Sequence, residues 1–333
     1  MAKIQKENKY FTYYYKRSIK ISLRHKLGNI KRYIKAIVYK ILMNTFVPKR
    51  KESTKYNVSI CGIFKNEGPY LKEWIEFHKI VGIEHFYLYN NNSEDNFREI
   101  LLPYIEKGTV TLVEWPKNHA QNESYYDCIE KYSKETKWLG FIDLDEFVVP
   151  KSTDDIYSFL KPFEKNRPAV LMYWKIFGSS GMVERDLSGL VIEDFTVCWK
   201  KYADMGKCFL NTKYIVDKSN KNSALNHLLW TKLSKILLPP VNIFNKISYG
   251  MYNPVKTEDF PIQINHYFSK TYKEYCLKKV RGDAYFEINP RDDDYFYYHE
   301  YKNTSVDYCA YKYLVKLKNS LMNFDKKINN KDE

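Results

Sequence analysis

Two aspartates near the middle of the chain, Asp143 and Asp145, have residue types and spacing that suit divalent-cation binding. They end the apolar run 138–147, which we predict to be one buried strand, and side chains two residues apart on a strand point to the same side. Adjacent carboxylates repel each other unless a cation compensates. Mn²⁺ or Mg²⁺ would supply that charge and keep positions open for a diphosphate. The alternative is an ordinary strand end whose acids cap the next helix.

His266 is the candidate third metal ligand, because it ends another apolar run at residues 261–267. A lone histidine is more often structural, and we interpret His78 and His85 in that way. Behind His266, a cationic helix over residues 270–281 carries Lys278 and Arg281, which are candidates for contacting an anionic group of the ligand.

Glu184 is the candidate catalytic base, because it closely follows the small-residue turn at 178–181. Small residues allow a ligand to approach the backbone. A carboxylate there would accept the proton of an acceptor hydroxyl, provided that it lies within hydrogen-bonding reach. An exposed loop acid without a catalytic role is the other interpretation.

Strand-like and helix-like segments alternate from residue 56 onward. We predict strands at 58–64, 85–89, 110–115 and 138–147. One helix is expected to begin near Pro69, a second to cover 97–107 and a third to cover about 120–135. Four β–α repeats with nearly continuous apolar strands favour an α/β fold with a mostly parallel, doubly wound sheet.

Ligands of such sheets bind beyond the carboxyl ends of the strands. We therefore expect four polar segments to lie together at the carboxyl edge of the sheet, namely residues 65–67, 90–95, 117–122 and 143–146. No glycine-rich dinucleotide motif or P-loop follows the first strand, so neither kind of nucleotide site is supported.

The net charge of +14 is confined to the N-terminal arm. Residues 1–51 hold 15 of the 54 lysines and arginines but a single acid, Glu7, so residues 52–333 are balanced. A nucleic-acid-binding protein spreads its basic residues over the binding face. The distribution therefore argues against a nucleic-acid partner.

Apolar residues recur in the arm at the spacing of one helical face, with Lys31, Arg32, Lys35 and Lys40 between them. A helix of this kind suits the surface of an anionic membrane, so we predict docking through residues 16–48. The alternative is a helix that packs its apolar stripe on the body. No signal-peptide pattern and no apolar run of about 18 residues is present. We therefore expect a cytoplasmic protein, peripheral at the inner face of the membrane.

Several motifs, in order, resemble those of glycosyltransferase family 92 (DUF23-like) and of bacterial family-2-like glycosyltransferases with the GT-A fold. The resemblance covers about residues 56–285. The motifs that carry it are residues 58–67, 71–78, 82–89, Ser93 with Asp95, 138–147, 177–181 and His266.

The resemblance implies a GT-A fold and a nucleotide-sugar donor, with a UDP-sugar as the expected one. Asp145 would bind the metal directly, His266 would be a further ligand, and Asp143 would contact the ribose or the ion through water. Transfer would be inverting. The residues expected to line the nucleotide pocket are Asn66, Glu67, Asn91, Ser93, Asp95 and Gln121.

We therefore divide the chain into a basic amphipathic arm (1–51), a GT-A domain (52–290) and a C-terminal helical tail (291–333). Residues 218–257, including 225–240, are expected to form a helix-and-loop insertion. The predicted function is a metal-dependent glycosyltransferase, acting on a glycan or lipid-linked acceptor in bacterial surface polysaccharide assembly. The alternatives are a nucleotidyltransferase that handles nucleotide-sugars and a non-enzymatic nucleic-acid-binding protein.

Overall fold

The computed structural model describes residues 23–50, 52–216, 225–250, 259–282 and 291–329, and its contacts divide the chain into two units. The first unit ends at Leu42 and contains most of helix α2 (Leu23–Thr45). The predicted arm helix is therefore confirmed, and taken by itself it leaves the apolar side chains of Ile34, Ile37 and Ile41 exposed. The part of the predicted membrane segment before residue 23 lies outside the described residues.

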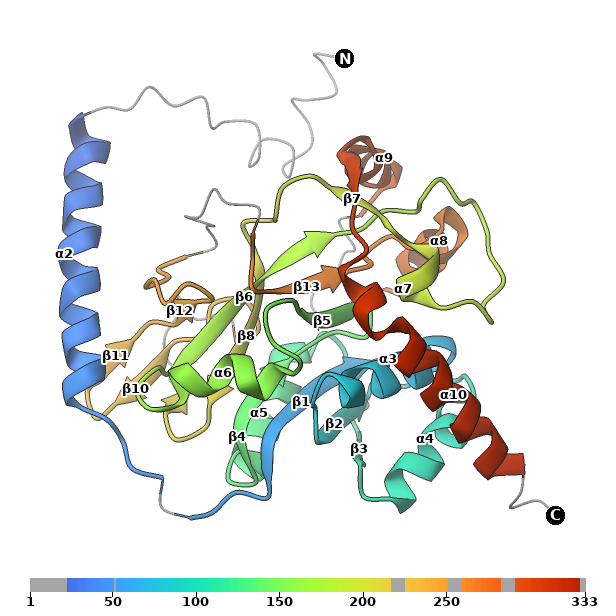
Figure 1. Cartoon of the computed structure of the whole chain (residues 1–333), viewed down its shortest axis with the longest axis horizontal. Helices are drawn as coiled ribbons and strands as arrows, with labels where there is room; N and C mark the ends of the chain where they lie inside the picture. Colours follow the sequence, from blue (N-terminus) through green and yellow to red (C-terminus); the bar gives the residue numbers. More distant parts are fainter. Residues whose placement is uncertain (1–22, 51, 217–224, 251–258, 283–290, 330–333) are drawn as a thin grey trace. The chain divides into compact units, whose positions relative to one another are not determined.

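The predicted β–α repeats are present at the start of the second unit (Figure 1). Pro69 lies in the first turn of α3, where its missing N–H costs no hydrogen bond. In chain order these elements are β1 (Tyr56–Phe64), α3 (Gly68–Ile80), β2 (His85–Asn90), α4 (Phe97–Glu106), β3 (Val110–Glu114), α5 (Gln121–Tyr132) and β4 (Thr136–Phe141).

β1 is the centre of this half, because it pairs in parallel with both β2 and β4, while β3 adds in parallel to β2. Connections between parallel strands are right-handed. The helices α3 and α4, which connect β1 to β2 and β2 to β3, therefore lie on one face of the sheet. The helix α5, which connects β3 to β4, lies on the other face. The predicted α/β class with a mostly parallel, doubly wound sheet is confirmed.

The second half of the unit extends the sheet to the order β3-β2-β1-β4-β8-β6-β13-β5, with β12 paired to β6. β8 is antiparallel to both β4 and β6, and β13 runs parallel to β6. The elements are β5 (Glu146–Pro150), α6 (Ile156–Glu164), β6 (Ala169–Ile176), α7 (Val191–Asp194), β7 (Val197–Trp199), β8 (Gly206–Asn211), β9 (Ile215–Val216), β12 (Val241–Asn242), β13 (Ile262–His266) and α8 (Tyr272–Arg281).

The described part of the predicted insertion contains strands in place of the expected helix. β10 (Thr231–Leu233) and β11 (Ile236–Leu238) form an antiparallel hairpin, and β10 also pairs with β9. Residues 225–250 of the predicted helix-and-loop insertion thus contain strands and no helix, and the rest of it lies outside the described residues. Thr231 and Leu238, which face each other in the hairpin, are buried.

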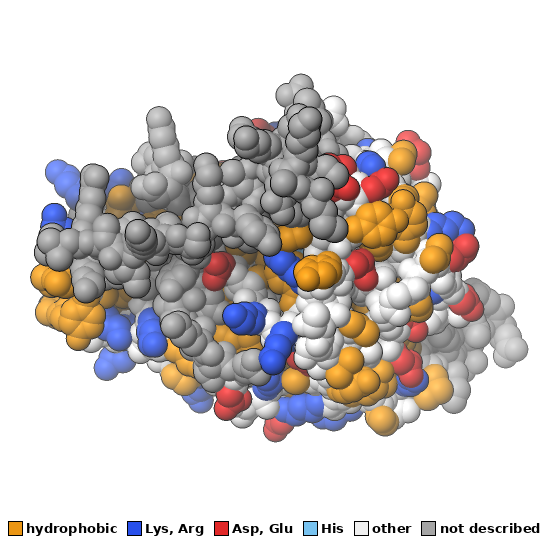
Figure 2. Space-filling model, turned by 90° about the horizontal axis from the view of Figure 1, so that it is seen from above, with side chains coloured by type: hydrophobic (Ala, Val, Ile, Leu, Met, Phe, Trp, Pro, Cys, Tyr) orange, Lys and Arg blue, Asp and Glu red, His pale blue; other side chains and the backbone are white. Residues whose placement is uncertain are grey.

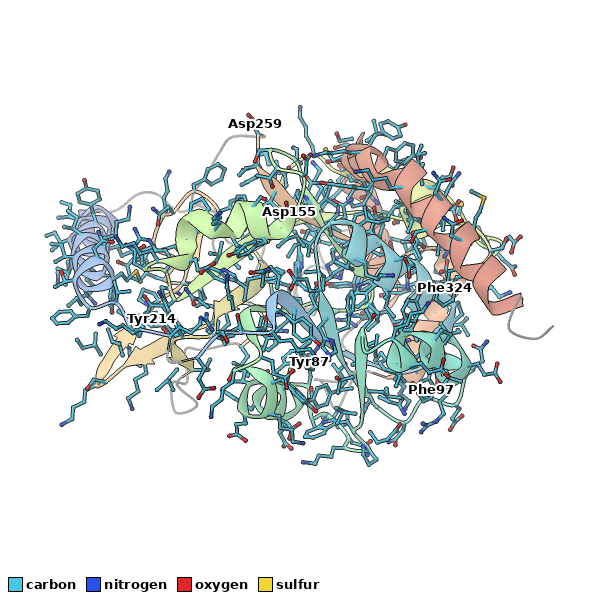
Figure 3. The ribbon with its side chains drawn as sticks, turned by 60° about the horizontal axis from the view of Figure 1, so that its bottom comes forward. Tyr87, Phe97, Asp155, Tyr214, Asp259 and Phe324 are labelled. Carbon is cyan, nitrogen blue, oxygen red and sulfur yellow. The ribbon has the colours of Figure 1, made fainter. Side chains whose placement is uncertain are left out.

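The C-terminal segment packs against the sheet domain and belongs to the same unit. It consists of α9 (Asp293–Tyr301), β14 (Asn303–Val306), the short 3₁₀ helix η2 (Cys309–Tyr313) and α10 (Leu314–Asn329). β14 pairs with β7, so the predicted helical tail also contributes a strand. α10, which carries the Phe324 labelled in Figure 3, packs on α3. The Phe324 ring stacks on the Tyr104 ring of α4 at 4.8 Å between centroids. No helix among the described residues is long and apolar enough to span a bilayer.

Candidate active site

Asp143 and Asp145 lie in the tight turn that joins β4 to β5. The predicted single strand over 138–147 is therefore wrong, and the two side chains do not share one strand face. The Glu146 N–H donates to the Asp143 carbonyl at 3.0 Å, while the Asp143 N–H donates to the Glu146 carboxylate, also at 3.0 Å. The buried Trp74 indole donates to the carbonyls of both residues. This network fixes the turn against α3.

The Asp143 carboxylate is held by three donors from two elements. Lys207 on β8 donates to Oδ2 at 2.7 Å, and Gln121 and Tyr125 on α5 donate to Oδ1 at 3.2 and 3.0 Å. Burial opposes ionisation here, but the Lys207 ammonium outweighs it, so the pKa of Asp143 lies below its ordinary value. The side chain is still 31% exposed, which leaves it accessible to a ligand hydroxyl.

Lys207 is a site residue that the sequence reasoning missed. Its side chain is fully buried, and its Nζ also lies 3.6 Å from the buried Glu146 carboxylate. Burial raises the pKa of Glu146 well above its ordinary value. The available signal was a lysine inside an otherwise apolar strand, since buried lysines occur almost only when paired.

Asp145 faces the opposite part of the site, where Lys278 of α8 donates to its Oδ2. His266, at the end of β13, places its Nε2 3.6 Å from the same oxygen. Burial again opposes ionisation, yet Lys278 and His266 together hold the pKa of Asp145 well below its ordinary value. The Tyr267 N–H donates to the Asp145 carbonyl at 2.8 Å, which ties β13 to the turn.

The donor set fits a divalent cation only in part. Asp145 and His266 are adjacent and of suitable type, and His266 Nδ1 is buried without a hydrogen-bond partner among the described residues. Asp143, the third predicted ligand, is engaged by Lys207. Within the described ranges, no three His, Cys, Asp or Glu side chains form a metal-binding group. Asp145 and His266 would therefore need diphosphate oxygens and water to complete a coordination shell.

Arg281 and Lys270 link α8 to the loop that follows β1. Arg281 donates to the carbonyls of Lys65 and Asn66 and forms an ion pair with Glu67 at 2.7 Å. Lys270 Nζ lies 3.6 Å from Glu67 and 3.3 Å above the Tyr70 ring. Glu67 is thus held by Arg281 and lies near Lys270, a further cation that the sequence reasoning missed. The contact of Glu67, Lys278 and Arg281 with a donor stays a prediction.

The other predicted nucleotide residues connect the loops at the carboxyl ends of the strands. Asn66, in a left-handed backbone conformation with φ of 50°, donates its N–H to Ser93 Oγ at 2.9 Å. The Gly68 N–H donates to Asp95 at 2.7 Å, and Asn91 donates to two carbonyls after β3. The structure thus shows a loop-shaping role for Asn91, Ser93 and Asp95, while their contact with a nucleotide stays a prediction.

Glu184 lies away from this cluster. Its carboxylate is 63% exposed and forms an ion pair with Lys273. Among the described residues, none of its contacts reaches Asp143 or Asp145. Its role as catalytic base stays a prediction without support from its surroundings. His78 and His85, interpreted as structural, are buried and hydrogen-bonded, and burial lowers their pKa values to about 3 and about 4.

Basic and acidic side chains are both present on the face that Figure 2 draws. Inside the site, Trp174 lies between His266 and His227, with ring centroids 4.6 and 5.1 Å away. These rings form an aromatic wall beside Lys207, whose Nζ is 5.9 Å from the Trp174 ring.

A protein family matches most of the chain. The family described as glycosyltransferase family 92 matches residues 54–280, a segment that includes the Asp143–Asp145 turn, Lys207, His266 and Lys278. All contacts described above, apart from those of Arg281 and the C-terminal segment, lie within it.

Individual relatives match over segments of different length. The chain is 34% identical over 100 residues to a glycosyltransferase family 92 protein of Arabidopsis thaliana, which is 30% of this chain and 17% of that protein. It is 31% identical over 129 residues to the galactan beta-1,4-galactosyltransferase GALS3 of Arabidopsis thaliana, covering 34% and 25%. The beta-1,4-galactosyltransferase galt-1 of Caenorhabditis elegans is 25% identical over 258 residues, covering 68% and 52%. The chain thus spans between a sixth and about half of these relatives.

Solved structures give weak matches. TarS of S. aureus aligns with 16% identity and a TM-score of 0.31 over 39% of this chain and 38% of that chain. Glucosyl-3-phosphoglycerate synthase from Mycobacterium tuberculosis, in a complex with Mn²⁺ and UDP, aligns with 14% identity and a TM-score of 0.26 over 36% and 44%. Neither likeness carries an argument about ligands of this chain.

Proposed function

Because the chain belongs to glycosyltransferase family 92, we propose that it transfers a sugar, with galactose as the first candidate, from a UDP-sugar to a glycan or lipid-linked acceptor. The galactosyl assignment is supported by the names of two relatives. The observation that carries the proposal is the fixed turn at the carboxyl end of β4, where Asp143 and Asp145 face buried or half-buried cations. Parallel α/β sheets bind their ligands at this edge.

In this proposal the donor diphosphate binds between Asp145 and α8. Asp145 and His266 would hold a divalent cation, which would neutralise negative charge on the leaving diphosphate. Lys278 and Arg281 lie on the same side and offer their charge to phosphate oxygens. The partly exposed Asp143 is oriented by Gln121 and Tyr125 to accept a hydrogen bond from the ribose.

The proposed transfer is inverting, in the assembly of a bacterial surface glycan, and it needs a base for the acceptor hydroxyl. Glu184 is the candidate from the sequence, although its ion pair with Lys273 favours a surface role. If Glu184 is the base, Glu184→Gln lowers kcat by about 10²-fold or more with little change in donor KM. A kcat within twofold of wild type excludes Glu184.

Calorimetry tests donor binding directly, with UDP-galactose, UDP-glucose, a GDP-sugar and a CMP-sugar, each with and without Mn²⁺. We expect tight binding of a UDP-sugar in the presence of Mn²⁺ and its loss in Asp145→Ala. Asp154→Ala is the matched control, since Asp154 is a 97% exposed carboxylate that pairs with Lys312. Thermal melts establish that both variants fold. Equal binding by Asp145→Ala and wild type would contradict the proposed site.

We also propose that α2 docks the protein on the anionic inner face of a membrane. The exposed Ile37 and Ile41 and the surrounding lysines provide apolar and electrostatic contacts. The full chain should float with vesicles that contain phosphatidylserine and remain behind with pure phosphatidylcholine. Flotation should be lost in Ile37→Glu/Ile41→Glu and retained in Val315→Glu, which changes an exposed apolar position on α10. Undiminished flotation of the double variant would exclude docking through α2.

A further inference from the structure

Lys278 is hydrogen-bonded to the carboxylate oxygen that a divalent cation would bind. Its ammonium donates to Asp145 Oδ2, the same atom that lies 3.6 Å from His266 Nε2. The side chain of Asp145 is only 6% exposed, whereas that of Lys278 is 22% exposed and lies beside the Phe268 ring. The lysine thus reaches a buried carboxylate from the more accessible side of the site.

An ammonium and a divalent cation cannot share this oxygen without strong repulsion, because like charges a few ångströms apart interact unfavourably in a partly buried site. The lysine must therefore move when a cation binds Asp145. Its helix need not move, since Arg281, one turn further along α8, anchors that turn to the carbonyls of Lys65 and Asn66. A four-carbon side chain can redirect its charge while the backbone stays fixed.

Lys278 also has a new partner available. The anchored end of α8 carries Arg281 toward the loop after β1, and the buried Lys270 adds a third cation close to Glu67. Arg281 and Lys270 already share Glu67, so an ammonium of Lys278 that a divalent cation displaces from Asp145 has lost its carboxylate partner.

We propose that Lys278 is an internal counter-ion that exchanges partners: it neutralises Asp145 in the donor-free protein and moves to the donor diphosphate when a divalent cation takes Asp145. This inference rests on the proposed function. The exchange makes metal and nucleotide binding mutually reinforcing. The divalent cation releases Lys278 for the diphosphate, and the diphosphate holds Lys278 away from the metal site. Such coupling between two ligands is reciprocal.

The test is Lys278→Met, with two affinities measured by calorimetry and by the Mn²⁺ EPR signal. We expect Mn²⁺ alone to bind about tenfold more tightly than to wild type, because its competitor is gone, and UDP at saturating Mn²⁺ to bind about tenfold more weakly, each a change of about 1.4 kcal/mol. Lys278→Arg should stay near wild type in both. Lys279→Met is the control, since Lys279 is the adjacent residue and pairs with Asp293 at the surface.

The opposite signs of the two changes identify the exchange. If Lys278→Met leaves Mn²⁺ affinity within twofold of wild type, or weakens both ligands, the lysine has no counter-ion role and the inference is overturned while the proposed function stands. If wild type itself binds neither Mn²⁺ nor UDP, the proposed function and the inference fall together. Far-UV circular dichroism and thermal melts of each variant separate these outcomes from misfolding.

Discussion

Replacing Lys207 with methionine tests whether a buried cation holds the Asp143–Asp145 turn. Lys207 is fully buried, and its Nζ lies 2.7 Å from Asp143. At that separation the attraction is about 6 kcal/mol for an effective dielectric constant of 20. Relief of the buried ammonium's desolvation offsets part of this value. Because breaking a buried pair typically costs about 3–5 kcal/mol and Asp143 stays partly exposed, we expect a loss of about 3 kcal/mol.

Urea denaturation at pH 7.5, followed by tryptophan fluorescence and circular dichroism, measures this loss. The pair's contribution should be constant from about pH 5 to 9. The lowered pKa of Asp143 means that the contribution disappears only as the pH falls below the ordinary carboxylate range, and the raised pKa of Lys207 means that it disappears only at strongly alkaline pH. A destabilisation below about 1 kcal/mol at pH 7.5 would refute the reasoning.

Two double-mutant cycles locate the interaction. Lys207→Met combined with Asp143→Asn should show a coupling energy of about 2–3 kcal/mol, within the range of contacting charged groups. Combined with Glu146→Gln, the coupling should be smaller, because Lys207 Nζ lies 3.6 Å from that side chain and 2.7 Å from Asp143. The reverse order of couplings would show that Glu146 carries the charge that Lys207 balances.

Three further predictions concern the scaffold of the site. Burial raises the pKa of Glu73 from 4.5 to about 7, so the folded state retains a proton that the unfolded state loses. Stability should therefore fall by up to about 3 kcal/mol between pH 4.5 and 7, and Glu73→Gln should flatten that slope in urea titrations. Gly206→Ala should cost about 1–3 kcal/mol or more in the same assay, because a Cβ would lie 1.7 Å from the Met172 carbonyl oxygen. Trp74→Phe removes the donor to Asp143 and Glu146 and should cost about 1–3 kcal/mol and weaken UDP binding by calorimetry.

The sequence alone determined the order of elements and the edge of the sheet where the site lies. Apolar runs between polar loops predicted β1 to β4 and their helices within a few residues, because burial on both faces of a parallel sheet leaves a continuous apolar pattern. Placing Asp143, Gln121 and Glu67 at one edge followed from the topology of such sheets. The sequence also predicted the positive charge of the arm and the apolar face of its helix.

The tertiary structure decided how the charges are paired, because pairing depends on which distant strands and helices become neighbours. Lys207 comes from a strand 64 positions beyond Asp143, and Lys278 reaches Asp145 from 133 positions away. No spacing rule connects such residues. The break of the strand at 142–145 was hidden for a related reason: the apolar run continues through the turn, whose geometry is set by the Trp74 indole and the Glu146 carboxylate. Sequence therefore identified the aspartates, and only the fold supplied the cations that hold them.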